Sequence, residues 1–306
     1  MTLAVIIVTW NSERVIGACL QSLAAASDEY EVWVVDNNSA DATVAIVENE
    51  FPRVRLIQNT DNLGFAKANN QAIDKSEASM FLILNPDTVV MPDTISIALK
   101  TFEELPDVGM LGVKLLNRDG SLQPSCFRFP GFFVNLAEQL ALYRIFDRGR
   151  RGRVFLSAFW EHDHKRPVDW IMGAFMLVSR ATVEKAGKIP EEYFMYGEDM
   201  DWCFRIWQNG MKVWFTPDAG IMHIGNDSGN QMPSEWGVQK RCESKYSFCR
   251  RSYGAIVTKF IEFTDMCGHS LRLAFYKLKG SRDETVPMIV DRLKISQRAA
   301  VTSLFR

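Results

Sequence analysis

Hydrophobic and polar residues alternate in blocks along the first third of the chain. Strands are expected at residues 3–8, 31–35, 54–58 and 80–84, and the apolar runs at 3–8 and 80–84 are typical of strands buried in a sheet. Apolar residues recur at helical spacing between these runs, within residues 12–26, 40–49 and 65–75. Strands that alternate with helices predict βαβ units and a mostly parallel sheet flanked by helices, with right-handed crossovers.

The strand predicted at residues 80–84 is followed by the polar segment Asn85-Pro86-Asp87. Pro86 cannot donate to a sheet, so the strand must end there. The Asn85 carbonyl and the Asp87 carboxylate are hard oxygen ligands, which suit Mg²⁺ or Mn²⁺ holding a diphosphate. The alternative is an ordinary polar turn at the end of a strand.

Polar side chains also follow the other strands, and the carboxyl ends of parallel strands meet at one edge of a sheet, where ligands bind. The Asp36 carboxylate could accept a hydrogen bond from a pyrimidine N–H or a ribose hydroxyl, or it could cap the next helix. The polar residues at this edge are Thr9 and Asn11 after the first strand, Asp36 and Asn38 after the second, and Asn85 and Asp87 after the fourth.

The middle of the chain predicts further strands and one acidic helix start. Glu198, Asp199 and Asp201 open a helix that runs to about residue 208, where acidic side chains also favour the helix dipole. A short run at 221–223 is expected to close the sheet and ends at His223, and a lone histidine is often purely structural. The other elements expected here are a helix at 94–104, strands at 109–116 and 212–215, a hairpin turn at 117–120, a strand pair or one long strand at 168–178, and a lid at 225–233.

Two segments combine apolar residues with Lys and Arg. Residues 132–146 have helical periodicity and run into an arginine cluster at 144–153, and residues 240–282 predict two amphipathic basic helices followed by a frayed tail. Such helices could lie on anionic lipid, pair with a second subunit to form a homodimer, or dock on the core. We therefore expect two domains, residues 1–235 and residues 236–306.

Composition and absent motifs exclude several classes of protein. The chain has 306 residues, 47% of them hydrophobic, and a net charge of −2, which argues against a general nucleic-acid-binding protein. Its six cysteines form no Cys-x-x-Cys pair, which fits a reducing cytosol, and the apolar start lacks the cationic lead of a signal peptide. Neither Gly-x-Gly-x-x-Gly after the first strand nor a P-loop is present, so a dinucleotide fold and a P-loop NTPase are disfavoured.

Seven short segments, in consistent order, resemble the inverting family 2 glycosyltransferases of the GT-A fold, above all their bacterial rhamnosyltransferase branch. The resemblance spans about residues 3–229 and leaves the C-terminal helices outside it. The segments are Val8-Thr9-Trp10-Asn11, Asp36-Asn37-Asn38-Ser39, Asn62-Leu63-Gly64-Phe65-Ala66 with Asn70, Leu84-Asn85-Pro86-Asp87, Trp170-Ile171-Met172-Gly173-Ala174, Gly197-Glu198-Asp199-Met200-Asp201 and His223.

The resemblance implies a role for each of these positions. Asp87 and His223 would bind the metal on the diphosphate, and Asp199, next to Glu198, would be the general base. Trp170, Met172, Gly173 and Asp201 would shape the acceptor site. The nucleotide would be bound by Thr9, Trp10, Asn11, Asp36, Asn38, Asn62, Gly64, Phe65, Asn70 and Asn85. The family's usual Asp-x-Asp is Asn85-Pro86-Asp87 here, so one metal-binding charge is missing.

The resemblance also implies an activity and a place of action. We expect an enzyme that moves L-rhamnose from dTDP-rhamnose to a glycan or a polyprenyl-diphosphate-linked acceptor of the cell envelope, at the inner face of the cell membrane. The alternatives are a transferase for another donor such as a UDP-sugar, a binding module without turnover, which the missing acid at Asn85 would explain, and a sugar-phosphate nucleotidyltransferase. The last is disfavoured because no glycine-rich loop follows the first strand.

Overall fold

The computed structural model describes residues 2–26, 29–224, 234–279 and 286–305. The chain forms two compact units. Unit 1 comprises Met1–Arg128 and Leu156–Ser228, and unit 2 comprises Phe129–Phe155 and Gly229–Arg306. The sequence predicts one division after residue 235, whereas the structure also groups residues 129–155 with the C-terminal helices.

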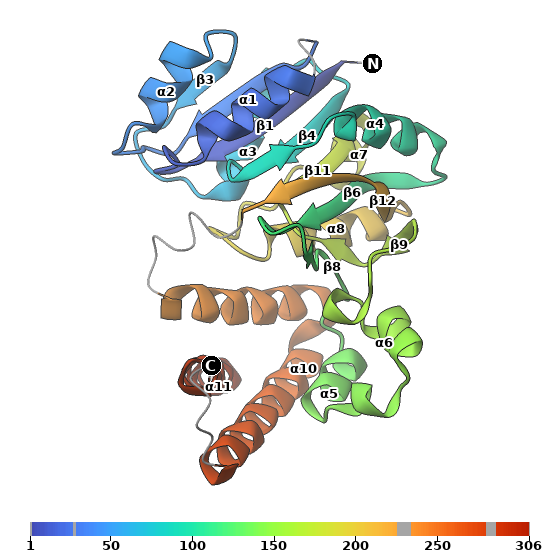
Figure 1. The fold of residues 1–306 in the computed structure, drawn as a ribbon. Coiled ribbons are helices and arrows are strands. Elements are labelled where there is room, and N and C mark those ends of the chain that lie inside the picture. The colour runs from blue at the N-terminus through green and yellow to red at the C-terminus, as the bar shows by residue number, and fades with distance from the viewer. Residues whose placement is uncertain (1, 27–28, 225–233, 280–285, 306) are drawn as a thin grey trace. The chain divides into compact units, whose positions relative to one another are not determined.

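Unit 1 is built on a ten-stranded sheet in the order β3-β2-β1-β4-β11-β6-β12-β5, with β7 paired to β6 and β9 paired to β12 (Figure 1). A separate pair joins β8 to β10. The strands are β1 Leu3–Thr9, β2 Glu31–Asp36, β3 Arg55–Gln58, β4 Met80–Leu84, β5 Thr88–Val90, β6 Val108–Leu116, β7 Leu122–Gln123, β8 Cys126–Phe127, β9 Arg166–Val168, β10 Trp170–Ile171, β11 Phe175–Ser179 and β12 Lys212–His223.

The strands β3, β2, β1 and β4 are parallel, as the βαβ pattern of the sequence predicts. Thr9 at the end of β1 lies opposite Asp36 at the end of β2, and Ile7 lies opposite Leu84 at the end of β4. β12 is parallel to β6, while β11 runs antiparallel between β4 and β6. The sheet is therefore mixed but mostly parallel in its first half, and its polar strand ends share one edge.

Helices cover the sheet of unit 1. Side chains of α1 and α4 share one hydrophobic core with alternate residues of the strands, such as Val5 and Leu82. α8 packs against the other face, where the Cys203 Sγ lies 3.6 Å from the Met110 Sδ. The helices of unit 1 are α1 Ile16–Ala26, α2 Thr43–Glu50, α3 Phe65–Lys75, α4 Thr94–Glu104, α7 Arg180–Ala186 and α8 Glu198–Gln208, and the 3₁₀ turn η2 covers Ser157–Phe159.

Two strand predictions needed correction. The apolar run 168–178 is divided among β9, β10 and β11, and β10 leaves the main sheet to pair with β8. The runs at 212–215 and 221–223 belong to one strand, β12, whose register shifts between Thr216 and Gly220. The residues between the two runs, Thr216-Pro217-Asp218-Ala219-Gly220, have the composition of a turn, so the sequence predicts a break where the strand continues through an irregularity. The lid predicted at 225–233 lies outside the described residues.

Unit 2 consists of helices: α5 Phe132–Gln139, η1 Leu142–Ile145, α6 Arg148–Phe155, α10 Ser234–Lys279 and α11 Val286–Leu304. The single helix expected over 132–146 is wrong, because Ala141 adopts a left-handed conformation (φ 54°) between α5 and η1. α10 turns at Gly254, whose φ is 82°, so it contains two helical segments. The frayed tail expected after residue 280 is also wrong, since α11 forms there.

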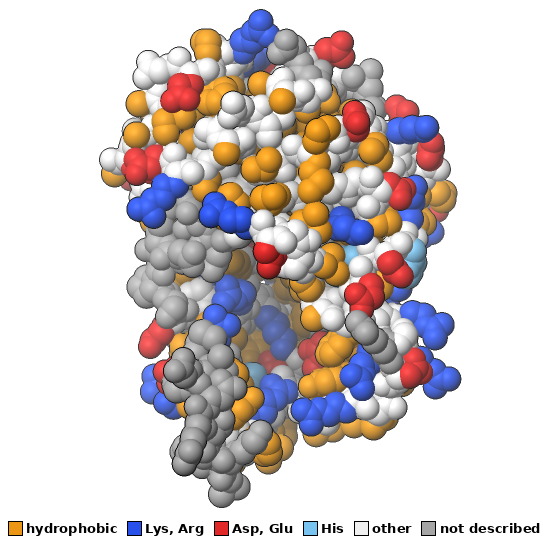
Figure 2. All heavy atoms as spheres, in the orientation of Figure 1, with side chains coloured by type: hydrophobic (Ala, Val, Ile, Leu, Met, Phe, Trp, Pro, Cys, Tyr) orange, Lys and Arg blue, Asp and Glu red, His pale blue; other side chains and the backbone are white. Residues whose placement is uncertain are grey.

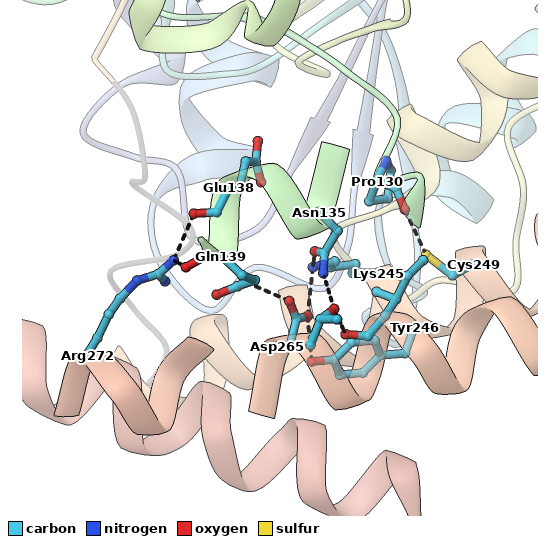
Figure 3. A network of polar contacts seen from close by, with 11 residues as sticks. Pro130, Asn135, Glu138, Gln139, Lys245, Tyr246, Cys249, Asp265 and Arg272 are labelled. Carbon is cyan, nitrogen blue, oxygen red and sulfur yellow. Dashed lines mark hydrogen bonds and ion pairs between the residues drawn. The ribbon is translucent and has the colours of Figure 1, made fainter. Parts of the chain in front are cut away.

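A buried polar network joins α5 to α10 within unit 2 (Figure 3). Asp265 accepts hydrogen bonds from Gln139 Nε2 at 2.7 Å, from Lys245 Nζ at 2.7 Å and from the Tyr246 hydroxyl at 2.9 Å. Lys245 also donates to Asn135 Oδ1 at 2.5 Å. Burial alone would raise the pKa of Asp265, but Lys245 and the hydrogen bonds outweigh it and lower the pKa. The network explains why residues 129–155 group with helices a hundred residues later.

Candidate active site

Side chains from the ends of β1 and β2 form one hydrogen-bonded cluster. The Thr9 hydroxyl donates to Asp36 Oδ1 at 2.8 Å, and both residues are buried. Ser39 donates to the same carboxylate from its hydroxyl at 2.5 Å and from its backbone N–H at 2.8 Å. These bonds leave acceptor capacity on the carboxylate, because a carboxylate has about four lone-pair sites. Asp36 is therefore held rigidly with room for one further donor.

The turns that follow these strands have left-handed residues. Asn11 (φ 49°) accepts a hydrogen bond from Ala40 N at 2.8 Å and its own N–H donates to Ser39, so the two turns are tied together. Asn38 has φ 64° and an exposed side chain. Trp10 is partly buried, and its backbone N–H donates to Ser12 Oγ at 3.3 Å. The predicted nucleotide-binding residues of the first two strands thus lie together at one edge.

A second loop, around Gly64, contacts the loop before α8. Asn62 Oδ1 accepts from the Gly64 N–H at 3.0 Å, and the Phe65 N–H donates to the Phe194 carbonyl at 3.1 Å. A side chain at Gly64 would place its Cβ 2.4 Å from that carbonyl oxygen. Only glycine permits this approach. Gly64 therefore joins the loop that holds predicted nucleotide-binding residues to the loop that leads to the predicted general base, Asp199.

Asn70 does not lie free for a ligand. Its Nδ2 donates to the Ile189 carbonyl at 2.9 Å and to Glu191 at 2.8 Å, and its Oδ1 accepts from the Ile189 N–H. The side chain is 3% exposed. We therefore assign Asn70 to the support of the loop before α8 instead of to direct nucleotide contact.

Asp87 and His223 meet at the end of β4. The His223 Nε2 lies 3.3 Å from Asp87 Oδ1, and the Asn85 Nδ2 lies 3.3 Å from the same nitrogen. β5 and β12 bring them together, since Thr88 pairs with His223 in the sheet. The residues that the resemblance assigns to the metal are thus adjacent, although 136 positions separate them in the sequence.

The side chains at this point suit a cation that takes its remaining ligands from other molecules. Within the described residues, no group of three or more His, Cys, Asp or Glu side chains could enclose a metal. Asp87 and His223 would supply an oxygen and a nitrogen, and both side chains are nearly buried. Mg²⁺ is commonly bound by one or two carboxylates together with substrate phosphates and water. The residues therefore fit a divalent cation whose remaining ligands come from a diphosphate.

Glu198 and Asp199 open α8 beside Gly173. The Gly173 N–H donates to Asp199 Oδ2 at 3.2 Å, and the Met200 N–H donates to Oδ1 at 2.8 Å. Glu198 is buried, and its Oε2 has no hydrogen-bond partner among the described residues. Burial raises the pKa of Glu198, and the Asp199 charge raises it further. Burial also raises the pKa of Asp199, against the two backbone donors, which lower it.

Asp201 has a different environment from its two acidic neighbours. Its Oδ2 accepts from the buried Tyr193 hydroxyl at 2.9 Å, and its Oδ1 pairs with Arg205 Nε at 3.2 Å. Both oxygens therefore stabilise the start of α8. The predicted acceptor role of Asp201 stays a prediction, and its contacts favour an indirect one.

Three of the predicted acceptor residues, Trp170, Met172 and Gly173, lie on one continuous stretch. The Trp170 indole stacks on Phe127 at 4.4 Å, and its Nε1 donates to the Arg128 carbonyl at 3.0 Å. The Met172 N–H donates to the Ser125 carbonyl at 2.9 Å. The next residue along, Gly173, contacts Asp199, so this stretch leads directly to the candidate base.

The sequence reasoning missed two residues of this edge. The Asn37 Nδ2 donates to the Gly64 carbonyl at 3.2 Å and so links the two nucleotide loops. The Gln123 Oε1 lies 2.6 Å from the Nδ1 of His223. Asn37 belongs to the segment Asp36-Asn37-Asn38-Ser39, whose position after a strand is a signal for a site residue, whereas nothing near Gln123 in the sequence indicates a partner 100 residues away.

Two overlapping family profiles match the chain between residues 4 and 241. Residues 4–126 match the profile described as Glycosyl transferase family 2, and residues 80–241 match the one described as Glycosyl transferase family group 2. Together they include every residue of the edge described above.

Individual relatives give a finer comparison. The chain is 28% identical over 257 residues to the N-acetylglucosaminyl-diphospho-decaprenol L-rhamnosyltransferase of Mycobacterium tuberculosis, covering 76% of this chain and 79% of that one. It is 24% identical to the rhamnosyltransferase WbbL of Escherichia coli, covering 72% and 83%. Among solved structures it resembles the mannosyltransferase PcManGT of Pyrobaculum calidifontis, in complex with GDP-Man and Mn²⁺, with a TM-score of 0.61, 17% identity and coverage of 99% and 86%.

Proposed function

The chain belongs to the family 2 glycosyltransferases and has the GT-A fold, and from this premise we propose that it transfers L-rhamnose from dTDP-rhamnose to a polyprenyl-diphosphate-linked glycan acceptor. It is a nucleotide-sugar-dependent hexosyltransferase. The relatives support the proposed sugar and acceptor by their names. Two of these relatives are rhamnosyltransferases, and the name of one of them specifies a decaprenol-linked substrate.

One observation carries the proposal: three functional groups gather where the parallel strands end. Asp36 is held at the end of β2, Asp87 and His223 meet beyond β4, and Asp199 lies against Gly173 just before β11. Ala174 connects the last two, because its carbonyl accepts from the Asn85 N–H at 3.2 Å. A nucleotide, its diphosphate and an acceptor hydroxyl need these groups in this order.

Each of these residues has a separate role in the proposed reaction. In the proposed reaction Asp36 holds the nucleoside, and Asp199 accepts the proton of the acceptor hydroxyl. The acceptor oxygen bonds to the anomeric carbon as the bond from that carbon to the diphosphate breaks. A single displacement of this kind inverts the configuration. A raised pKa suits Asp199 to this task, because a base works best when its pKa lies near the working pH.

Asp87 and His223 would hold the Mg²⁺ or Mn²⁺ of the donor diphosphate. When bound, the cation would neutralise the charge that develops on the leaving diphosphate. The presence of Mn²⁺ in the PcManGT complex supports such an ion but does not distinguish it from Mg²⁺. Asn85 would contribute a carbonyl or an amide contact without charge.

The test is nucleotide release from a panel of nucleotide sugars, with Mg²⁺ or Mn²⁺ and a lipid-linked acceptor. The proposal predicts release of dTDP from dTDP-rhamnose well above that from UDP- and GDP-sugars. Preferential release of UDP would assign the enzyme to another donor. Absence of release from every donor would overturn the proposal of transfer.

A second candidate is a module that binds a nucleotide sugar without turnover. The substitution of the first metal-binding acid by Asn85 and the two-residue donor set favour it. The candidate base argues against it, because Asp199 is fixed by two backbone donors. Calorimetry that shows donor binding with no product after hours would support the module over the enzyme.

We also propose that unit 2 binds the anionic inner leaflet of the cell membrane, which would make the enzyme a peripheral protein of its cytoplasmic face. The segment of α10 after Gly254 carries large apolar side chains at helical spacing, and each exposes more than half of its surface. An exposed apolar face of this kind typically marks an interaction site. These side chains are Ile256, Phe260, Phe263, Leu271 and Phe275.

Neighbouring helices extend this face and add charge. The rings of Phe133, Phe132 and Phe260 are in series, with centroids 5.3 and 6.2 Å apart. Figure 2 shows Lys and Arg side chains gathered beside hydrophobic ones over α5 and α6. Apolar side chains next to arginines suit the boundary between lipid headgroups and acyl chains. Among the described residues, no helix combines the length and apolar character needed to span a membrane.

Vesicle binding tests this part of the proposal. Binding to anionic vesicles should exceed binding to neutral ones and should weaken with salt, because exposed charges are screened beyond about 10 Å at 0.1 M ionic strength. The variant Phe260→Ser/Leu271→Ser should bind less at every salt concentration. Equal binding to both kinds of vesicle would show that electrostatic attraction does not contribute to membrane binding. If the variant instead separates a homodimer in light scattering, the face is a subunit interface.

A further inference from the structure

His223 has polar neighbours at both ring nitrogens. Its Nδ1 is 2.6 Å from Gln123 Oε1, and its Nε2 is 3.3 Å from both Asp87 Oδ1 and Asn85 Nδ2. A neutral imidazole carries its proton on one nitrogen only, and the other nitrogen presents a lone pair. Whether Nε2 faces Asp87 with a lone pair or with a proton therefore depends on what the Gln123 amide presents to Nδ1.

A chain of hydrogen bonds fixes the direction of that amide. Asp119 is an exposed carboxylate that accepts from the Ser121 hydroxyl at 2.6 Å, and the bonds from Ser121 lower the pKa of Asp119. Because the Ser121 proton is used there, its oxygen must accept from Asn117 Nδ2, which lies 2.9 Å away. The Asn117 Oδ1 is then free to accept from Gln123 Nε2 at 3.0 Å. The Gln123 oxygen consequently faces His223, and the Nδ1 of His223 must donate to it.

This chain gives the hairpin between β6 and β7 a role in the site. The Asn117 N–H donates to the Ser121 carbonyl at 2.8 Å and the Gly120 N–H donates to the Asn117 carbonyl at 2.9 Å, so the turn itself is closed by the backbone. β7 then pairs with β6 through Leu115 and Gln123. The backbone therefore sets Gln123 in place, and the side chains of the turn set its orientation.

We propose that Gln123 is a positioning residue that holds His223 in its Nδ1–H tautomer, so that the Nε2 lone pair is presented beside Asp87 to the divalent cation of the donor diphosphate. This inference rests on the proposed metal-dependent transfer. In this tautomer Nε2 accepts from the Asn85 Nδ2 at 3.3 Å in the metal-free protein, and His223 and Asp87 would supply a nitrogen and an oxygen ligand to a divalent cation. When a residue that fixes the tautomer of a histidine ligand is mutated, metal affinity typically falls by about 10- to 100-fold.

The first experiment reads the tautomer directly in the metal-free protein. Long-range ¹H–¹⁵N correlation spectra distinguish the two tautomers, and the chain has only four histidines to assign. His223 should be protonated on Nδ1 in the wild type and in Gln123→Glu, which keeps an acceptor. In Gln123→Leu it should shift toward the Nε2–H form. A wild-type His223 protonated on Nε2 would overturn the proposal.

The second experiment measures Mn²⁺ affinity in the presence of dTDP, from the free-ion signal in electron paramagnetic resonance. Gln123→Leu should weaken Mn²⁺ binding by about 10- to 100-fold. Gln123→Glu should retain most of it, and Asn117→Ala should lie between them. The control is Gln58→Leu, which removes an exposed glutamine bonded to Glu48 at 3.0 Å and should change nothing.

The two measurements separate this inference from the function on which it rests. If the tautomer is as proposed but the wild type binds no Mn²⁺ with dTDP, metal-dependent transfer fails and the role of Gln123 toward a cation fails with it, while the assigned tautomer stands. If the wild type binds Mn²⁺ and Gln123→Leu binds it equally well, only the role of Gln123 is refuted. Should Gln123→Leu not fold, Asn117→Ala supplies the same comparison, because it removes the group that orients the amide.

Discussion

Replacing Gly64 by alanine tests the contact between the nucleotide loop and the loop before α8. Gly64 has φ 82° and ψ 175°, a region that side chains rarely adopt. An added Cβ would lie 2.4 Å from the Phe194 carbonyl oxygen and 3.1 Å from the Phe194 Cδ2. Since the Phe65 N–H donates to that same oxygen, the two loops would have to separate and the bond would break.

The magnitude follows from a comparison with Gly187. Gly187 has nearly the same conformation, φ 84° and ψ 167°, but nothing lies within 4 Å of an added Cβ. The backbone strain of alanine should therefore be similar at both positions, about 1–3 kcal/mol. Gly64→Ala adds the overlap, about 1–3 kcal/mol, and the lost hydrogen bond, about 0.5–1.5 kcal/mol. It should destabilise the protein by roughly 2–4 kcal/mol more than Gly187→Ala.

Urea unfolding followed by tryptophan fluorescence measures this difference. Every tryptophan except Trp236 belongs to unit 1, so the signal reports the unit that contains both glycines. The free energy of unfolding of Gly64→Ala should fall well below that of Gly187→Ala, and its dTDP affinity should fall too. Equal destabilisation by the two substitutions would show that the loops do not approach as closely as the structure indicates.

Four further substitutions test the remaining assignments. Asp199→Asn keeps the shape and removes the basicity, so kcat should fall by about 100-fold or more with donor affinity nearly unchanged. Asp201→Asn should cost far less turnover but should lower the melting temperature, because Tyr193 and Arg205 lose a charged partner. Asp87→Ala should abolish most activity and weaken Mn²⁺ binding, whereas Asn85→Asp should be tolerated and should tighten it. Activity assays, donor titration and thermal unfolding provide these readouts.

The buried Glu198 predicts a dependence of stability on pH. Its pKa is raised in the folded state, so above the ordinary pKa of glutamate the unfolded chain releases a proton that the native protein keeps. Native stability is therefore lost as the pH rises from the ordinary pKa of glutamate, 4.5, to the raised pKa of Glu198, about 8. Glu198→Gln removes this loss. Glu198→Gln should melt with the wild type at pH 4 and above it at pH 8.5. A melting temperature that is lower at both values would show that the Glu198 carboxyl is stabilising.

Some results would reassign these roles. If Asp199→Asn mainly weakens donor binding, or if Glu198→Gln at normal donor affinity is the less active enzyme, the base is misassigned. Near-normal turnover of Asp87→Ala at limiting metal would refute the metal assignment. Turnover loss in Asp201→Asn as large as that in Asp199→Asn would place Asp201 in contact with the acceptor.

The sequence predicts the first half of the sheet well because its strands are separated from one another by segments with helical periodicity. Met80–Leu84 has the predicted bounds, and the polar residues that follow the strands lie at one edge, as expected. It fails where one apolar run serves two sheets, as at Trp170–Ile171, and where a single residue such as Ala141 adopts a left-handed conformation. Neither feature changes the periodicity of the side chains.

The candidate site shows the same division. The carboxylates could be named from their positions after strands or at a helix start, since those positions determine where they lie. The partners of those groups could not, because they depend on pairings between distant strands. Gln123 reaches His223 only because β6 brings β7 and β12 together, and Asn70 turns to Ile189 instead of to a ligand.

The most direct test of the central claim is the product of one defined reaction. The purified protein is incubated with dTDP-rhamnose, Mn²⁺ and a synthetic N-acetylglucosaminyl diphosphate lipid, and the product is analysed by mass spectrometry and NMR. We predict the addition of one rhamnose, with an anomeric configuration opposite to that of the donor, and its loss in Asp199→Asn. An unmodified acceptor under conditions in which the protein binds dTDP, or a product that retains the donor's configuration, would contradict the proposed single displacement.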